Sequence, residues 1–243
     1  MNGPPRPVSR WPLARALAIG IVLCAVLDFL AVRSYAIYDR YSGFADHFNT
    51  VGVIFLVFWL TAFSLVAHVT RRAFGLSGRE LAVVYAMLMI ATAIPTMGFG
   101  GYLFPLIAGV YYYGSPENGW PEMLWPNLPR WIAPQDPEVI RQLFEGMPAG
   151  ASVPWGEWLG PLALWGTFFG AFFLVSIAAV SLMYEQWAER ERLIFPLAVL
   201  PITLTESLDR PEESIFRKRL FWAGLAIACF HPLYNFSIRF WSA

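Results

Sequence analysis

The stretch that decides the fold is residues 159–184, LGPLALWGTFFGAFFLVSIAAVSLMY, in which 26 consecutive residues carry no charge. An apolar stretch of about 20 residues is long enough to cross a bilayer as an α-helix. Four other stretches share this apolar character, so the expected spans are 14–32, 49–70, 81–106, 159–184 and 220–238. The sequence therefore predicts an all-α fold, a polytopic transmembrane helix bundle forming a single domain over residues 1–243 in the cytoplasmic (inner) cell membrane.

The composition supports lipid as the solvent. Hydrophobic residues make up 57% of the chain and charged residues only 14%, against about 25% charged residues in a typical soluble domain. The 17 basic and 17 acidic residues cancel, which excludes a nucleic-acid binder that relies on net positive charge. The 11 Trp, 10 Tyr and 20 Phe exclude an intrinsically disordered chain, because such a sequence collapses in water.

The orientation follows from the Lys and Arg counts in the segments between spans. From the N-terminus to the C-terminus these counts are 3, 2, 3, 2, 6 and 1. Five crossings with a cytoplasmic N-terminus put 12 basic residues inside and 5 outside. The first run also has the basic flank of a signal peptide, but its apolar core exceeds the usual ~7–15 residues. A retained signal anchor is the interpretation we adopt.

The third run is too long for one simple crossing. It stays apolar over residues 81–113, which would extend about 50 Å as a helix, whereas the bilayer core is about 30 Å thick. Its middle contains residues that interrupt helices, namely Pro95, Gly98, Gly100 and Gly101. One interpretation is a broken helix, which is typical of a transporter binding site. The other is a plain helix that ends near Gly101, followed by an interfacial segment over 102–113.

Segment 114–158 is expected to form an external cap rich in Pro and Trp. Its eight prolines exclude long regular structure, and its tryptophans favour the membrane–water boundary. One short helix is predicted within it, with Asp136 as the N-cap, Pro137 at the first helical position and Gly146 after the last turn.

Segment 185–219 is expected on the cytoplasmic side. A charged patch that includes Glu189 and Glu191 precedes 12 apolar residues, 193–204, which Pro196 and Pro201 interrupt. This apolar stretch is too short to span. It fits a re-entrant segment, a segment lying on the surface, or one packed into a larger bundle.

Two polar residues within the spans are candidates for a substrate or ion pathway. Asp28 is the one carboxylate inside an expected span, where a charge costs at least about 2.5–3.5 kcal/mol. It is a candidate for proton or ion coupling; alternatively it lies near the outer interface, within reach of Arg33. His231 lies in the middle of the fifth span, one turn before Asn235. This polar pair would contact a substrate or a neighbouring helix.

The remaining motifs point to packing and not to catalysis. Gly166 and Gly170 form a GxxxG motif in the fourth span, which favours close approach of two helices. Cys24 and Cys229 lie within apolar runs, where cysteine behaves as a small hydrophobic residue. No catalytic motif, metal-ligand pattern or nucleotide-binding loop is present in the sequence. We therefore expect no enzyme activity, no cofactor and no metal site.

Three segments resemble those of a family of uncharacterised bacterial polytopic membrane proteins that are distantly related to the oligopeptide transporter superfamily. The segments are residues 76–87, residues 115–118 with Trp131 and the helix after Asp136, and residues 187–201. The resemblance covers roughly residues 14–228 and implies a transporter-like fold without an established substrate. Full members continue with further spans, so this chain resembles their N-terminal part, and we expect it to be a fragment, a split gene product or a short member.

Two functions are compatible with these features. The first is part of an oligopeptide-transporter-like solute transporter that moves an unidentified small solute. The candidate pathway residues are Asp28, Pro95, Gly98, Gly100, Gly101, Glu189, Glu191, Pro196 and His231. The second is a non-catalytic accessory subunit of a larger membrane complex. The expected partners are the lipid bilayer and either a second copy of the chain or a larger complex, and no nucleic acid.

Overall fold

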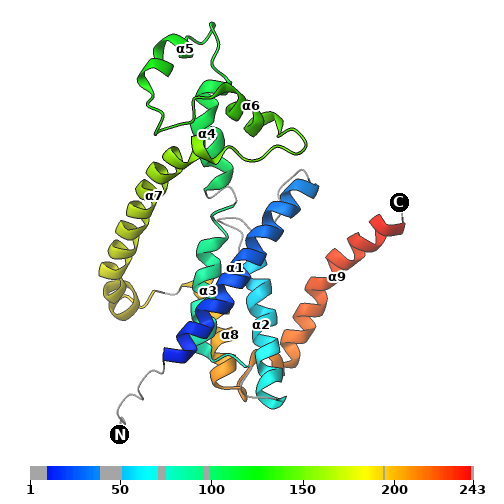
Figure 1. Ribbon diagram of the computed structural model, residues 1–243. Coiled ribbons are helices and arrows are strands. Elements are labelled where there is room, and N and C mark those ends of the chain that lie inside the picture. Colours follow the sequence, from blue (N-terminus) through cyan, green and yellow to red (C-terminus); the bar gives the residue numbers. More distant parts are fainter. Residues whose placement is uncertain (1–9, 39–50, 71–74, 96–98, 194, 242–243) are drawn as a thin grey trace. The chain divides into compact units, whose positions relative to one another are not determined.

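The computed structural model describes residues 10–38, 51–70, 75–95, 99–193 and 195–241. Every regular element within these residues is helical, and none of them forms a strand (Figure 1). Three helical stretches there are long and apolar enough to cross a membrane: Leu13–Ser34, Val51–Thr70 and Trp155–Arg190. They match the first, second and fourth expected spans. The all-α class is confirmed, and these helices are those of a membrane protein.

The helices group into two compact units, where the sequence predicts a single transmembrane domain. The first unit consists of residues 1–96 and 195–243, and the second of residues 97–194. The first contains α1 (Arg10–Tyr38), α2 (Val51–Thr70), α3 (Gly78–Ala91), α8 (Pro196–Asp209), the 3₁₀ turn η3 (Ile215–Arg217) and α9 (Arg219–Trp241). The second contains α4 (Gly100–Tyr112), α5 (Trp120–Met123), the 3₁₀ turn η1 (Trp125–Asn127), α6 (Pro137–Glu145), α7 (Trp155–Tyr184) and the π-helical turn η2 (Glu185–Arg190).

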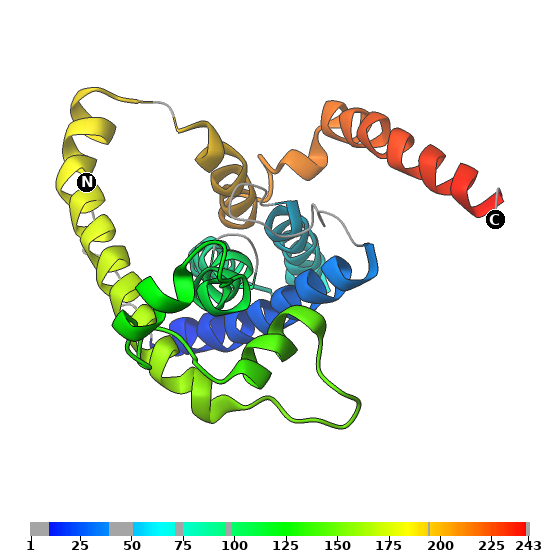
Figure 2. The ribbon, with the colours of Figure 1, turned by 90° about the horizontal axis from the view of Figure 1, so that it is seen from above.

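The core of the first unit lies between α1, α2, α3 and α8, and Figures 1 and 2 show α1, α2 and α3 side by side. Its fully buried side chains include Leu27 of α1, Val57 of α2, Leu88 of α3 and Leu204 of α8. Gly20 lets α1 approach α3 closely, since a Cβ there would overlap the Met87 side chain. The three arrangements expected for the apolar segment 193–204 stay predictions; within the first unit, α8 packs against α2 and α3.

The third apolar run does not form one continuous helix. α3 ends at Ala91, residues 92–95 form turns and bends, and α4 begins at Gly100. The expected helix over 81–106 is therefore interrupted, and the expected interfacial segment 102–113 is largely the helix α4. The physical reason is the local sequence: Pro95 disfavours continuation of α3, and the glycines around residue 100 tolerate non-helical backbone.

The second unit is built around α4, α6 and the start of α7. Leu103 and Ile107 of α4 pack with Ile140 of α6 and Trp158 of α7. The short helix α6 is confirmed as predicted: Asp136 caps it by accepting hydrogen bonds from the backbone N–H groups of the second and third helical residues at 2.8 and 3.2 Å. Gly146, with φ of 97°, follows its last turn.

The rest of α7 is apolar and exposed. From Phe168 to Tyr184 none of its side chains is buried in the described structure. The hydroxyls of Thr167, Ser176 and Ser181 each donate to the carbonyl four residues earlier, at 2.7–2.9 Å. In lipid every polar group needs an internal partner, so this surface is suited to a bilayer. α9 covers the fifth expected span and extends away from α1–α3 (Figure 2).

Candidate functional site

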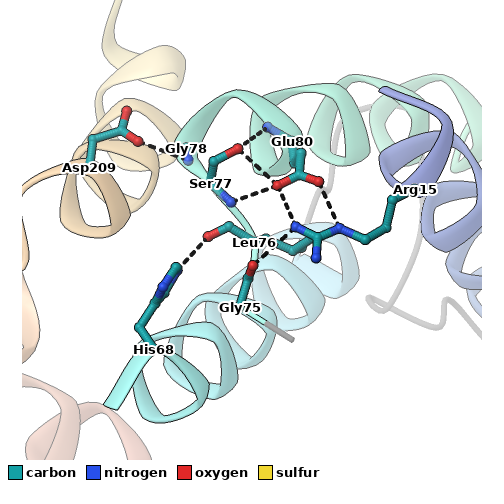
Figure 3. Close-up of polar contacts among 8 residues, drawn as sticks. All are labelled: Arg15, His68, Gly75, Leu76, Ser77, Gly78, Glu80 and Asp209. Atoms are coloured by element: carbon teal, nitrogen blue, oxygen red, sulfur yellow. Dashed lines mark hydrogen bonds and ion pairs between the residues drawn. The ribbon is translucent and has the colours of Figure 1, made fainter. Parts of the chain in front are cut away.

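A polar cluster in the first unit joins four helix ends (Figure 3). We call it the cap cluster; it consists of Arg15, His68, Gly75, Leu76, Ser77, Gly78, Glu80 and Asp209. Arg15 comes from the start of α1, His68 from the end of α2, and Asp209 from the end of α8. The other residues form the turn before α3 and its first residues.

Arg15 and Glu80 form a two-pronged ion pair at the centre of the cluster. Arg15 Nε donates to Glu80 Oε1 at 2.8 Å, and Arg15 Nη2 donates to Glu80 Oε2 at 2.7 Å. The Glu80 side chain is only 4% exposed, whereas that of Arg15 is 39% exposed. Arg15 Nη2 also donates to the Gly75 carbonyl at 3.1 Å. One guanidinium thus holds both a buried carboxylate and the turn before α3.

Ser77 and Glu80 form a capping box at the start of α3. Glu80 N–H donates to Ser77 Oγ at 3.4 Å, and Ser77 N–H donates to Glu80 Oε2 at 2.9 Å. The reciprocal bonds satisfy two backbone donors that a helix start leaves without internal partners. Burial acts to raise the pKa of Glu80, but hydrogen bonds from Arg15 and Ser77 outweigh it, so the pKa lies below its ordinary value. Glu80 is therefore a stably ionised structural carboxylate.

Two glycines allow neighbouring helices to reach this turn. Gly78 N–H donates to Asp209 Oδ1 at 3.0 Å, and a Cβ on Gly78 would lie 2.7 Å from the Thr205 carbonyl oxygen of α8. His68 Nε2 lies 2.9 Å from the Leu76 carbonyl oxygen. A Cβ on Gly75 would lie 2.6 Å from the His68 ring. The cluster thus fixes the ends of α2 and α8 against the start of α3.

Asp28 lies in α1, away from the cap cluster. One of its carboxylate oxygens, Oδ1, is buried and has no hydrogen-bond partner within the part of the chain that the structure describes. Such buried, unsatisfied polar atoms are uncommon in folded proteins. Arg33, which the sequence places within reach, does not bond to this oxygen, since the oxygen has no partner among the described residues.

The residues expected near the interruption of the third run fall into two units. Pro95 follows the turn after α3 in the first unit. Gly100 and Gly101 are the first two residues of α4 in the second unit. Gly98 lies outside the described residues. These positions mark the interruption itself, and no ligand-binding arrangement of side chains is formed by them in the described residues.

The other candidates lie in or directly after η2, in α8 and in α9. Glu189 and Glu191 are exposed at the end of the π-helical turn η2, where Gln186 Nε2 donates to Glu191 Oε1 at 2.8 Å. Pro196 is the first residue of α8. His231 belongs to the helix α9, but its side chain lies outside the described residues, as does that of Asn235.

The GxxxG motif of α7 forms no close contact in its unit. A Cβ built on Gly166 or on Gly170 would meet no atom within 4 Å among the residues that the structure describes. Close packing against a helix at this motif stays a prediction that concerns a partner or another part of the assembly.

Sequence reasoning missed the cap cluster as a site. The signal for part of it was present, because Ser77-Gly-Arg-Glu80 has the spacing of a capping box. The partners Arg15 and Asp209 carry no comparable signal, since they are 65 and 131 residues away from the groups they bind.

The comparisons with known proteins identify a family of unknown function. A family of unknown function (DUF6785) matches residues 5–236. The chain belongs to this family. The DUF6785 match covers the cap cluster, Asp28 and the interruption between α3 and α4, so these features lie within the family's matched region. Neither the curated proteins nor the solved structures contain a match to the chain.

Proposed function

We propose that the chain is part of a solute transporter of the oligopeptide-transporter type. It would lie in the cytoplasmic membrane with five spans and a cytoplasmic N-terminus, and it would act on an unidentified small solute without a cofactor. The observation that carries the proposal is Asp28, a carboxylate in an apolar helix whose buried Oδ1 has no partner among the described residues. An intramembrane carboxylate of this kind marks an ion or proton pathway by default.

The position of Asp28 along α1 supports this function. α1 and α3 run in the same direction, since Arg15 bonds Glu80 and Gly20 lies against Met87. Asp28 is therefore about 20 Å beyond Arg15, and the end of α3 is about 17 Å beyond Glu80, at ~1.5 Å per residue. Asp28 thus lies near the level at which α3 ends. The C-terminal end of a helix carries partial negative charge, so a proton or a cation would be needed to neutralise this region.

Two half-length helices add to the argument. α3 and α8 have 14 residues each, or about 21 Å at ~1.5 Å per residue, and the Gly78–Asp209 hydrogen bond joins one end of each. The bilayer core is about 30 Å thick, so α3 alone does not complete the third of the five proposed crossings, and α8, which is not one of the five, is also too short to cross. Interrupted or short helices at membrane depth are typical of transporter binding sites.

The cap cluster supports the proposed orientation. It gathers the start of α1, the end of α2 and the start of α3 at one end of the first unit. α1 and α2 therefore run in opposite directions, as two successive crossings require. Since segments 1–15 and 71–80 each carry three basic residues, the positive-inside rule assigns this end to the cytoplasm.

A second function, a non-catalytic subunit of a larger membrane complex, is favoured by α7. Its 18-residue apolar window has no buried residue, and the GxxxG face at Gly166 and Gly170 is open. Partner helices or lipid would cover this surface. This alternative needs no water at Asp28, which separates it from transport.

The test compares water access at two neighbouring positions of α1. In a cysteine-free background (Cys24→Ala, Cys229→Ala), Asp28→Cys and Phe29→Cys are made separately in the full chain. Phe29 is the matched control, since it lies at the same depth and is 69% exposed on the outer surface of the helix. Membranes are treated with a small water-soluble methanethiosulfonate reagent, and the labelling rates are measured.

The transport proposal expects Asp28→Cys to react at least about tenfold faster than Phe29→Cys, since thiolates form in water and not in lipid. An unreactive Asp28→Cys contradicts a polar pathway at this residue. Combined with stable co-purification of a second protein, that result would favour the accessory subunit; a monodisperse monomer would count against the accessory subunit.

A further inference from the structure

A polar pocket lies in the first unit between the C-terminal end of α8 and the segment that contains η3 and leads to α9. Its volume is about 480 Å³, which falls within the ~300–1,000 Å³ range of small-molecule sites. Thr203, Glu206, Ser207 and Arg210 line it from α8 and the residue after it, and Glu213, Ile215 and Lys218 line it from the following segment. The wall is held in place by Ser207, whose hydroxyl donates to the Thr203 carbonyl and accepts from Ile215 N–H.

The pocket presents charges of both signs that are not firmly paired. Within the described residues, neither the Glu206 carboxylate nor the Lys218 ammonium has an ion-pair partner. Arg210 Nη1 and Glu213 Oε2 are 3.8 Å apart, with both side chains 70% exposed, so this pair is weak in water. Two cations and two carboxylates therefore remain available for a ligand that itself carries both a negative and a positive group.

The face of α8 that lines the pocket changes from apolar to polar side chains toward the C-terminal end of the helix. Thr203, Glu206 and Arg210 follow one another at intervals of three and four residues, so they share a face. Val199 and Ile202 continue the same face toward the N-terminus and are 53% and 51% exposed. This face is thus polar at its C-terminal end and apolar beyond it, which matches a ligand with a charged head and an apolar tail.

A basic segment of the kind found at the membrane–water interface lies next to the pocket. Arg217 and Lys218 directly precede the apolar helix α9, and Arg219 is its first residue. Such basic clusters lie at the headgroup level, where they attract lipid phosphates. Leu220 and Ile227 of α9 are exposed. An exposed apolar surface therefore follows the pocket residue Lys218 along the chain as well.

We propose that this pocket binds the headgroup of a phospholipid that carries both a phosphate and a primary ammonium, as in phosphatidylethanolamine. Arg210 and Lys218 bind the phosphate, and Glu206 and Glu213 accept hydrogen bonds from the ammonium. The acyl chains lie along the exposed apolar side chains of α8. The proposal does not rest on transport; it requires only that α9 begins at the membrane surface.

The experiment measures lipid binding to the full chain by native mass spectrometry after delipidation in detergent. Phosphatidylethanolamine, phosphatidylcholine and phosphatidylglycerol with identical acyl chains are compared. The choline group has no N–H to donate, and the glycerol headgroup has no cation. Soluble phosphoethanolamine is titrated in parallel, because it carries the same charged groups without acyl chains.

Two variants remove one charge each from the pocket, Glu206→Gln and Lys218→Gln. Each has a control that removes one charge outside the pocket lining: Glu212→Gln for Glu206→Gln, and Arg79→Gln, at an exposed residue of α3, for Lys218→Gln. Because each pocket variant removes one charge-assisted hydrogen bond to the headgroup, we expect it to bind phosphatidylethanolamine about tenfold or more weakly. The two controls are expected to bind it as the unchanged chain does.

Three results would overturn the proposal. Equal affinity for the three lipids would remove the headgroup specificity. Equal weakening by the pocket variants and their controls would reduce the effect to general surface charge. Binding of soluble phosphoethanolamine as tightly as the lipid would reassign the pocket to a free zwitterionic solute. Failure of this experiment leaves the water-access result at Asp28 unaffected, because the two tests measure different residues and different ligands.

Discussion

Glu80 accepts hydrogen bonds from four donors, two on Arg15 and two on Ser77. A buried carboxylate is stable only when it is paired and hydrogen-bonded, and these four bonds meet that need. The consequence is a dependence of stability on pH. Because the pKa of Glu80 in the folded chain lies below its ordinary value of 4.5, the ionised form contributes stability above that value. This contribution is lost as the pH falls through the lowered pKa.

We therefore predict that Glu80→Gln lowers the thermal unfolding midpoint of the detergent-solubilised chain at pH 7 by roughly 3–10 °C, through the loss of a buried charged acceptor. The difference from the unchanged chain should shrink as the pH is lowered below 4.5. Glu138→Gln is the control, since Glu138 pairs with Arg141 on the exposed surface of α6 and such pairs contribute about 0–1 kcal/mol. A Glu80→Gln difference that stays constant from about pH 7 to about pH 3 would contradict this prediction.

Gly78 is the second residue on which the cap cluster depends. A methyl group at this position would overlap Asp209 and the backbone of α8, so Gly78→Ala is expected to destabilise the chain by about 1–3 kcal/mol. Gly224→Ala is the matched control, because Gly224 is a helical glycine of α9 with no described atom within 4 Å of a built Cβ. Its midpoint should stay unchanged or rise slightly, as alanine favours a helix over glycine by ~0.5–1 kcal/mol. The finding of equal midpoints for the two variants would refute the close approach of α8.

The sequence allows some of these residue-level features to be predicted and not others. Asp136, Pro137 and Gly146 act within a few residues of the helix that they delimit, so the limits of α6 follow from local chemistry. The bond between Arg15 and Glu80 depends on how α1 and α3 pack. Nothing in the residues next to Arg15 specifies that partner.

Among the helices, α7 combines membrane-spanning length with a surface on which the hydroxyls of Thr167, Ser176 and Ser181 are satisfied internally. The sequence predicts this element well, because an uncharged run of 26 residues has few alternatives to a spanning helix. The helix limits within the third run are less predictable. Its hydropathy continues through Pro95 and the following glycines, so hydropathy alone does not locate the end of α3 at Ala91.

A charge on α7 tests whether this helix spans the bilayer. Val175 is 66% exposed in the middle of the apolar stretch, and Asp at the centre of a spanning helix costs about 2.5–3.5 kcal/mol. We expect Val175→Asp to lower the fraction of the protein that remains in membranes after alkaline carbonate extraction. Val153→Asp, which makes the same change in the loop before α7, should have no effect. Equal extraction of the two variants would show that the exposed surface of α7 does not face lipid.

For the whole molecule, the sequence predicts the all-α class and the membrane environment, since both depend on the lengths of apolar runs. The packing of α8 against α2 and α3 does not depend on the lengths of apolar runs, so the sequence does not predict it. Pro196 and Pro201 indicate only a short, interrupted apolar segment, which is compatible with three arrangements. The contact of Gly78 with Asp209 fixes the end of α8 against the start of α3, and it arises from the complementary surfaces of helices far apart in the chain.

The bond between Gly78 and Asp209 also bears on the order in which the protein is made. These residues are 131 positions apart, and residues 97–194, the second unit, lie between them in the sequence. At ~5–20 residues per second, the ribosome needs about 7–26 s to reach Asp209 after it has made Gly78. During this interval α1, α2 and α3 are complete while their α8 partner is missing. The first unit therefore closes only after the second has been synthesised, and the surface that receives α8 must be shielded by lipid or by the insertion machinery until then.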